Sequence, residues 1–542
     1  MDKRTLLAIV LSLVLVIVYQ NFFLKKPVPE QQPSATIEET QDVVAGKAAP
    51  DETIVTKAAP APETVLIKKP DAEVAAQDIT VDTPLYTAVF STRGAALKSL
   101  KLKKYRETLD KEAGYIELVN VMEGMNYPLS LSFPKSSINV SPDIIYTTDT
   151  TSITLTETTD IATLKFSREY PGEIRIDKVY TIYAGKYNFD LEVDVVNLSK
   201  EIIKQSALLA WTRYVDPDVK IDRYSHEGPV SYVKEKLETD KVTKLDEPEL
   251  YGPDVSWAGY ESKYFIAVAI PQQPSLTNLA VSRDSENLVR VDLEGPKNII
   301  LPGQAGTFKY GLYAGPKDYD ITKEVGVGIE NSINFGSWIK WLALPLLVVL
   351  KFIYTYVHNY GFAILILTFL VKIIFWPLGN ISYRSMKEMQ KLQPKINEIR
   401  ERYKDDKQKI NQEVMSLYKT YKVNPMSGCL PMLIQLPVFL GLYKALLYSI
   451  ELRHSPLMFW IQDLSAKDPY YITPIIMGAT MFLQQKMSPQ PGGDAMQAKL
   501  MMWMPVIFTF LFLNFPSGLV VYWLFNNVLS IGQQYYVNKR KS

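Results

Sequence analysis

The sequence is poor in the residues that most chemically active sites require. Its 542 residues include one cysteine, Cys429, and three histidines, His226, His358 and His454. One cysteine excludes an intramolecular disulfide, and no group of His and Cys has the spacing of a metal site. The G-x-x-x-x-G-K-[ST] loop that holds nucleotide phosphates is absent as well. We therefore expect no cofactor, no metal, and no nucleotide or redox chemistry of the protein's own.

A large excess of charge of one sign is also missing, because the formal net charge is only +1 at pH 7. This balance argues against DNA or another polyanion as a partner of the whole chain. What the sequence does contain is a division into two halves. Residues 25–320 resemble a soluble protein, whereas residues 335–537 hold most of the long apolar runs.

The first apolar run lies at the N-terminus, within residues 1–24. At about 1.5 Å per residue it nearly crosses a 30 Å hydrocarbon core. A cleaved signal peptide is the alternative, but no small-x-small site follows the run, and the next residues are Lys25, Lys26 and Pro27. We predict an uncleaved transmembrane anchor, followed over 25–75 by a flexible linker rich in Pro, Ala, Glu, Gln and Thr.

Residues 76–320 have the pattern of a β domain. Stretches such as "ITVDTPLYTAVFST", "YNFDLEVDVVN" and "AGTFKYGLYAGP" alternate apolar and polar residues and are separated by Gly, Pro, Asn and Asp. This alternation predicts a large, mostly antiparallel β-sandwich with a core big enough to fold independently.

The second half contains five further segments that we predict to span the membrane. They are 356–378, 428–450, 470–487, 500–514 and 519–537, with a loop at 488–499 and a basic tail at 538–542.

The connection 379–427 decides the topology. It carries eleven Lys and Arg against six Asp and Glu, and such a loop belongs in the cytoplasm. Lys3, Arg4 and the basic tail predict a cytoplasmic location as well. These clusters share one side only if 321–355 does not span, so we interpret it as an amphipathic interfacial helix anchored by tryptophans. The prediction is six spans, both termini cytoplasmic, and the β domain outside.

The basic connection also has internal order. Met389, Leu392, Ile396, Ile399 and Tyr403 step by three and four residues, and so do the residues from Ile410 to Tyr421. Two such seams, separated by the polar "KDDKQ", predict an antiparallel coiled-coil hairpin, kinked or restarted at Pro394 in its first arm. A solvated connector is the alternative.

Lys372 is the unusual residue of the spans. A charged side chain at the bilayer centre costs roughly 2.5–3.5 kcal/mol on insertion scales. Lys372 could snorkel to the cytoplasmic headgroups, or it could line a hydrated cavity. Other spans carry polar side chains that serve either as interhelical contacts or as walls of that cavity: Thr368, Gln435, Gln484, Gln485, Asn526, Asn527, Ser530 and Gln533.

Several longer motifs resemble those of one known family. "VNPMSGCLPMLIQLPVFLGLY", "IQDLSAKDPYYITPIIMGATMFLQQKMSP" and "MPVIFTFLFLNFPSGLVVYW" are similar to the YidC/Oxa/Alb membrane-protein insertases. "FSTRGAALKSLKL", at 90–102, resembles the start of the periplasmic domain of the Gram-negative members. The resemblance extends over nearly the whole chain except the linker.

The resemblance implies a polytopic α-helical protein of the bacterial inner membrane with a periplasmic β-supersandwich. Its five core helices would enclose a hydrophilic groove open to the cytoplasm and to membrane lipids. It would insert nascent membrane proteins alone or beside the Sec translocon, and its hairpin would contact the ribosome and targeting factors. The implied groove residues are Lys372, Thr368, Gln435, Gln484, Asn526, Tyr522 and Trp523, and the implied hairpin contacts are Lys391, Lys395, Arg400, Arg402 and Lys407.

Two positions depart from the family's pattern. The groove charge is usually Arg, and Lys372 replaces the planar, two-pronged guanidinium by a point charge. The pair Tyr522–Trp523 stands where some relatives have two tyrosines. We expect Lys372 to attract the acidic tail of a substrate from groove water.

Two other classes of function compete with this interpretation. A transporter or channel would suit the intramembrane amides and lysine, although no inverted repeat is evident. A membrane-tethered enzyme acting on sugars would need two facing carboxylates. The 25–320 segment has many acids, which the sequence does not pair, and a single histidine, His226.

Overall fold

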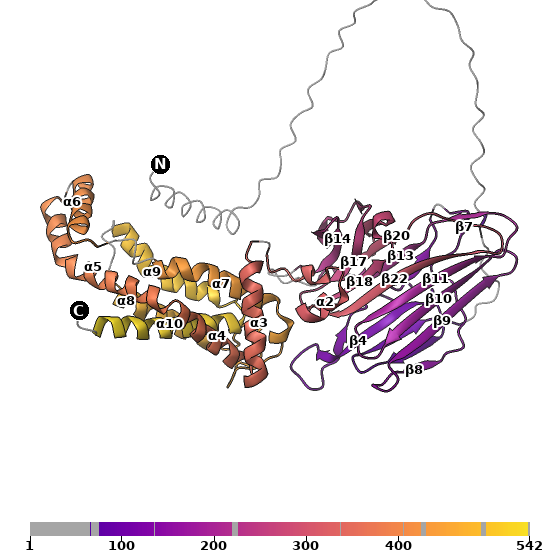
Figure 1. The fold of residues 1–542 in the computed structure, drawn as a ribbon, viewed down its shortest axis with the longest axis horizontal. Coiled ribbons are helices and arrows are strands. Elements are labelled where there is room, and N and C mark those ends of the chain that lie inside the picture. The colour runs from indigo at the N-terminus through magenta and orange to yellow at the C-terminus, as the bar shows by residue number, and fades with distance from the viewer. Residues whose placement is uncertain are drawn as a thin grey trace, which may run out of the picture. The chain divides into compact units, whose positions relative to one another are not determined.

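The computed structural model describes residues 65–66, 75–134, 136–218, 226–336, 338–404, 406–423, 430–488 and 495–539. The predicted anchor at 1–24, most of the linker at 25–75 and Cys429 lie outside the described residues. So do Arg540 and Lys541 of the basic tail and residues 489–494 of the predicted loop at 488–499, whereas residues 495–499 of that loop belong to a helix. The described chain consists mainly of strands up to residue 316 and mainly of helices beyond it (Figure 1).

Three sheets make up most of the β domain. The largest has eight strands in the order β15-β14-β17-β18-β22-β11-β10-β9. Its strands are β9 (Ile161–Tyr170), β10 (Ile174–Tyr183), β11 (Asn188–Asn197), β14 (Gly228–Val233), β15 (Lys236–Thr239), β17 (Val255–Glu261), β18 (Phe265–Pro271) and β22 (Ala305–Pro316). All of its pairings are antiparallel, as the alternating sequence predicts.

Two five-stranded sheets complete the layers, in the orders β16-β19-β20-β13-β6 and β5-β4-β3-β2-β8. The first contains β6 (Ser130–Ser132), β13 (Leu208–Tyr214), β16 (Glu249–Tyr251), β19 (Asn278–Arg283) and β20 (Leu288–Glu294). The second contains β2 (Asp78–Asp82), β3 (Tyr86–Ser91), β4 (Ala96–Arg106), β5 (Tyr115–Glu117) and β8 (Ser152–Thr154). Two small pairs remain: β1 (Val65–Leu66) with β7 (Ile138–Asn139), and β12 (Ile203–Gln205) with β21 (Asn298–Ile300).

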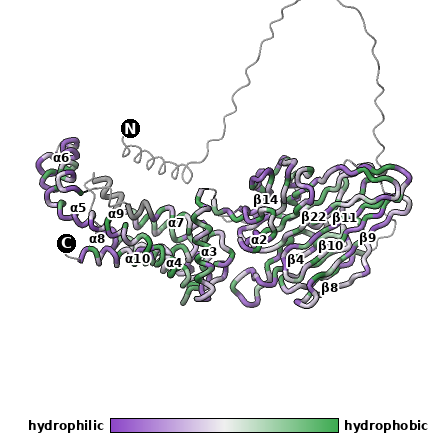
Figure 2. Tube along the Cα trace, viewed as in Figure 1, coloured by the Kyte–Doolittle hydropathy of each residue, from purple (hydrophilic) through white to green (hydrophobic). Residues whose placement is uncertain are grey.

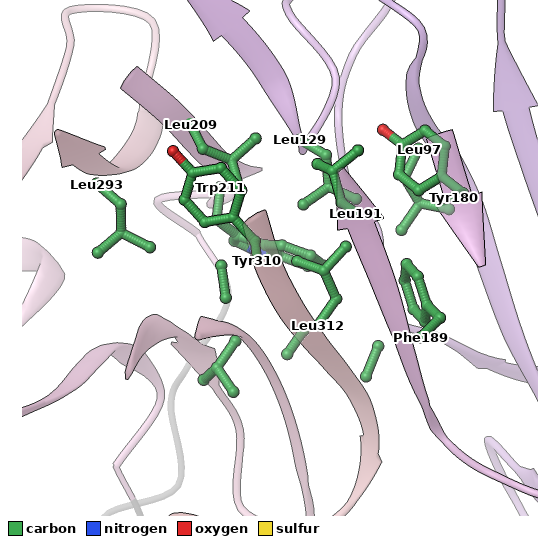
Figure 3. Close-up of a cluster of buried hydrophobic side chains, with 14 of the residues drawn as sticks. Leu97, Leu129, Tyr180, Phe189, Leu191, Leu209, Trp211, Leu293, Tyr310 and Leu312 are labelled. Carbon is green, nitrogen blue, oxygen red and sulfur yellow. The ribbon is translucent and has the colours of Figure 1, made fainter. Parts of the chain in front are cut away.

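One hydrophobic core joins the three sheets. In β11 the sequence "NFDLEVDVVN" buries every second residue, including Phe189 and Leu191, because alternate side chains of a strand point to opposite faces. Figure 3 shows these residues with Leu97 of β4, Trp211 of β13 and Leu312 of β22 in the same cluster. Each such side chain contributes about 1.5–3 kcal/mol on burial. The sheets therefore form one β-rich domain, as predicted.

A lysine lies inside this core. Lys178 of β10 is 0 % exposed, and its Nζ donates to the carbonyl oxygens of Gly94, at 3.0 Å, and Leu129, at 2.7 Å. Burial lowers the pKa of Lys178 to about 7, because the apolar surroundings disfavour the charged form.

The second half is helical. Its α-helices are α2 (Tyr319–Val325), α3 (Lys340–Val357), α4 (Tyr360–Ile374), α5 (Trp376–Arg402), α6 (Lys407–Thr420), α7 (Leu430–Tyr448), α8 (Ile472–Met487), α9 (Ala495–Phe512) and α10 (Ser517–Lys539). Short 3-10 helices occur in both halves: η1 (Val242–Lys244) and η2 (Pro274–Leu276) lie in the β domain, and η3 (Ile329–Ser332) and η5 (Ile450–Leu452) lie beyond it.

Helix length gives a smaller set of candidate spans than the sequence predicts. Among the described residues, α3 alone is an unbroken helix both long and apolar enough to cross a bilayer. The helices α4 and α5 qualify only as a pair, and the pair is bent by 65° at a break near Phe375. A shorter apolar helix covers Met502–Phe512. This criterion therefore does not confirm six spans.

The two faces of α3 have different surroundings. Ala343, Leu347 and Leu350 are buried against the helical bundle, whereas Trp341 and Tyr356 on the other face are exposed. The two lysines of the helix are held by polar partners. Lys340 donates to the Asn331 side chain at 2.9 Å, and Lys351 lies among carboxylates, those of Asp318 (3.5 Å), Asp320 and Glu451 (3.0 Å). The exposed face is consequently apolar.

The helices α5 and α6 form the hairpin. Leu392 and Ile396 of α5 pack against Val414 and Tyr418 of α6, so the two seams read from the sequence meet. No new helix starts at Pro394, which lies inside α5. Figure 2 shows the hydrophilic character of α6 and the apolar character of α4.

Candidate functional site

Lys372 lies in the last turn of α4 and is tied to α10. Its Nζ donates to the Ser530 hydroxyl at 2.6 Å, and that hydroxyl donates to the Asn526 carbonyl oxygen at 2.7 Å. Ser530 is buried, while Lys372 is half-buried. The lysine is therefore held by a neutral hydroxyl on the inner side of the helices, which snorkelling alone would not require.

One face of α10 carries the polar residues of this region. Tyr522, Asn526, Ser530 and Gln533 are spaced by four, four and three residues, so they form a stripe along the helix. Near one end of the stripe, the buried Tyr522 hydroxyl accepts a hydrogen bond from the Gln435 side chain of α7. Two side chains predicted from the sequence, 87 residues apart, thus meet.

A residue that the sequence reasoning missed joins the cluster around Lys372. Tyr383 of α5 is 4 % exposed, and its hydroxyl lies beside the side chains of Ser530 and of Gln484 of α8. Ser530 and Tyr383 thereby bring Lys372 and Gln484, both of which were predicted, into one cluster. Tyr383 was missed because the basic segment 379–427 was assigned to the cytoplasm. Its spacing of three from Met386, and then Met389, was the available signal.

Three predicted residues are placed differently. The Thr368 hydroxyl donates to the Ile364 carbonyl oxygen at 2.6 Å, within its own helix, so it does not reach the cluster. Asn526 contributes its backbone carbonyl to Ser530. Trp523 packs edge-on against Phe439, with ring centroids 4.6 Å apart, and its Nε1 is buried without a hydrogen-bond partner in the described part of the chain.

Further amides of α10 act as contacts between helices. The Asn527 amide donates to the Thr480 hydroxyl of α8 at 3.3 Å, and the Gln534 amide donates to the Met487 carbonyl oxygen at 3.0 Å. Gln533 binds the start of α5 through Trp376 and Asn380. For these residues the interpretation as interhelical contacts applies.

The predicted basic residues of the hairpin have different surroundings. Lys391 pairs with Glu388 at 2.7 Å, and Lys395 binds the Tyr421 hydroxyl and lies 4.5 Å from the centre of its ring. Arg402 is exposed and Arg400 half-buried. Lys407 begins α6, and its side chain lies outside the described part.

Charged groups suited to a metal do not converge in the described residues, where no three His, Cys, Asp or Glu side chains could hold an ion together. The helical site is thus made of one ammonium, hydroxyls and amides. Such groups can bind and orient an anion or a peptide.

Comparison with known proteins covers both halves of the chain. The family model described as the 60Kd inner membrane protein matches residues 352–542, and the model of the YidC periplasmic domain matches residues 78–349. A protein of Syntrophus aciditrophicus (strain SB) named membrane protein insertase YidC is 60% identical over 545 residues, 100% of each chain. A protein of the same name from Geobacter metallireducens is 44% identical and covers 99% of this chain and 98% of its own. A solved structure described as an active YidC insertase matches 85% of this chain and 93% of its own at 21% identity and a TM-score of 0.37.

Proposed function

The chain belongs to the YidC family of membrane protein insertases, and we propose that it captures the hydrophilic tail of its substrates at the polar cluster around Lys372. The family assignment makes the protein an insertase of the inner membrane with a periplasmic β domain, and the family is not one of enzymes. The observation that carries the proposal is the bond between the Lys372 ammonium and the Ser530 hydroxyl, at 2.6 Å.

The state of Lys372 suits capture of a carboxylate. Among the described residues, the hydrogen-bond partner of its ammonium is a hydroxyl, which leaves its positive charge unneutralised. A substrate carboxylate would form a charge-assisted hydrogen bond, which is roughly twice as strong as a neutral one. Tyr383 and Gln484 supply neutral donors and acceptors beside it. An acidic tail would therefore be favoured over a basic one.

Release of the substrate into lipid would follow from the apolar surfaces of α9. Trp503, Ile507 and Phe510 of this helix are exposed, and in the membrane they would contact lipid or the substrate's own helix. Transfer of about twenty apolar substrate residues into lipid would then supply the driving force, so no nucleotide would be needed.

The membrane arrangement completes the proposal. We place six spans in the inner membrane with both termini in the cytoplasm, and α3 at the periplasmic interface. The apolar exposed face of α3, with both of its lysines bound internally, supports contact with lipid. The hairpin would lie in the cytoplasm, where Lys391, Lys395, Arg400, Arg402 and Lys407 would meet ribosomes and targeting factors. The Sec translocon is the proposed partner for larger substrates.

Reconstitution of the purified protein into vesicles tests this function. The substrate is a short single-span protein with an acidic tail, and protection of that tail from added protease measures translocation. We expect protection well above that in empty vesicles, and a several-fold loss in Lys372→Ala and Lys372→Glu. Lys444→Ala is a matched control, because Lys444 is a half-buried lysine of α7 that lies over the Tyr448 ring instead.

Two outcomes would contradict the proposal. Normal insertion by both Lys372 variants would exclude capture by this charge. Protection no better than in empty vesicles, combined with steady flux of a solute, would favour the transporter or channel.

A further inference from the structure

The sequence explains why the helix breaks between α4 and α5, but it does not explain the angle between the two helices. Pro377 is the second residue of α5, where it lacks an N–H and its ring excludes the Ile373 carbonyl from a helical bond. No side chain of the neighbouring residues caps the start of α5. A proline break permits many directions, yet the two helices are bent by 65°. Something outside the break must hold this angle.

Gln533 of α10 is bound to the beginning of α5. Its Nε2 donates to the Trp376 carbonyl oxygen at 3.0 Å and to the Asn380 Oδ1 at 3.1 Å. Gln533 is 1 % exposed. Both hydrogens of the amide are thereby used on the first turn after the break.

A glycine makes this approach possible. A Cβ at Gly379 would lie 2.7 Å from Gln533 Nε2, closer than atoms in contact can come. Its φ is not in the left-handed region, so the backbone conformation does not require glycine there. Glycine inside a helix costs about 1 kcal/mol relative to alanine. The close contact with Gln533 is the reason that the structure offers for it.

The same helix also binds the other side of the break. Lys372, before the break, donates to Ser530, and the hydroxyl of Tyr383, after it, lies beside the same serine. Val537 packs with Tyr383 in a small apolar cluster. The C-terminal part of α10 therefore contacts both α4 and α5.

We propose that Gln533 is a positioning residue that sets the direction in which the hairpin α5–α6 leaves the helices holding Lys372. The part of α5 from Asn380 to Glu398 is about 27 Å long at 1.5 Å per residue. A change of about 10° at the break would move its end by about 5 Å. Its effect on insertion rests on the proposed function, in which the hairpin receives ribosome-bound chains.

A distance measurement tests the positioning directly. Spin labels are placed on Ser416→Cys of α6 and Gly532→Cys of α10, in the full chain with its single cysteine changed to serine. Ser416 is exposed, and a Cβ at Gly532 meets no atom within 4 Å. In Gln533→Met, which keeps the length but not the donors, we expect the distance distribution to shift or broaden by about 5 Å.

The neighbouring residue provides a matched control. Gln534 is also a buried glutamine of α10 with its amide on a backbone carbonyl at 3.0 Å, but that carbonyl belongs to Met487 of α8. Gln534→Met should leave the distribution unchanged. An unchanged distribution in Gln533→Met, or an equal change in both variants, would overturn the proposal. None of these readouts depends on insertion, so a failure of the proposed function would be seen separately.

Insertion measurements test the consequence for the reaction. Gln533→Met should slow the insertion of ribosome-bound chains several-fold and leave the insertion of a purified, released substrate unchanged. Gly379→Ala should reproduce this split, because its Cβ displaces Gln533. An equal loss with both kinds of substrate would make Gln533 a structural residue only and would overturn its role in positioning the hairpin for the reaction.

Discussion

The buried Lys178 should make the stability of the β domain depend on pH. Its pKa is about 7 in the folded domain and 10.5 as the ordinary value that applies to the unfolded chain. Between these values the unfolded chain binds more protons than the folded one, so the free energy of unfolding rises with pH. Burial of this amine lowers the free energy of unfolding. The loss is nearly complete at pH 7 and disappears as the pH approaches 10.5.

The size of the effect follows from the two pKa values. A difference of one between the pKa of the folded and unfolded states corresponds to about 1.36 kcal/mol, which limits the full penalty to about 5 kcal/mol. When the pH rises from 7 to 9, this penalty on the free energy of unfolding should shrink by about 2 kcal/mol. Lys178→Met removes the titration and keeps an unbranched chain of similar length. It also leaves the carbonyls of Gly94 and Leu129 without this donor, at a cost of about 1–3 kcal/mol that does not vary with pH.

Urea unfolding of the fragment 75–336, followed by circular dichroism at pH 7, 8 and 9, measures this difference. The fragment contains the whole shared core except Ile450, so we expect it to fold by itself. The unfolding free energy of the wild-type fragment should rise by about 2 kcal/mol relative to that of Lys178→Met between pH 7 and 9. Lys101→Met, at an exposed position of β4, is the control and should leave the wild-type slope unchanged. Parallel pH profiles for wild type and Lys178→Met would refute the reasoning, whichever protein is more stable.

Three further changes probe the helical half. Lys372→Arg should retain insertion of acidic-tailed substrates in the vesicle assay, because the positive charge remains. A loss of insertion as large as that of Lys372→Ala would show that the size or hydration of the side chain matters more than its charge. Gln435→Leu should lower the free energy of unfolding by about 1 kcal/mol, because the buried Tyr522 hydroxyl loses its donor. A thermal melt in detergent that is indistinguishable from that of the wild type would argue against this bond. Gly478→Ala should separate α8 from α9, because its Cβ would lie 2.0 Å from the Thr509 hydroxyl. Cross-linking between cysteines placed on the two helices should therefore fall. Unchanged cross-linking would contradict such close packing.

Much of the β domain could be predicted from the sequence because its signal is local. The alternation in β11 already identifies the buried residues Phe189 and Leu191. The hairpin could be predicted for the same reason, since Leu392 and Ile396 follow the spacing of a helical seam. In both cases the residues that define the pattern are neighbours in the chain.

The residues that were missed depend on contacts between distant segments. Alternation along β10 places Lys178 on the buried face with Tyr180, but its acceptors come from residues 84 and 49 positions away. Tyr383 was assigned to the cytoplasm because the count of basic residues treats 379–427 as one unit. That count gives the side of the membrane on which a connection lies, but it does not show where the helix leaves the bundle.

The structure also separates two roles that the sequence left joined. Gln533 uses both hydrogens of its amide on α5, so it would have to break two buried bonds to receive a substrate. Lys372 has three hydrogens on its ammonium, and one of them goes to Ser530. A carboxylate could therefore bind Lys372 without breaking the bond that holds it. In α10 the amides that hold the helices together lie on turns adjacent to the hydroxyl that holds the Lys372 ammonium. The same helix therefore both stabilises the bundle and positions the charge that would capture a substrate.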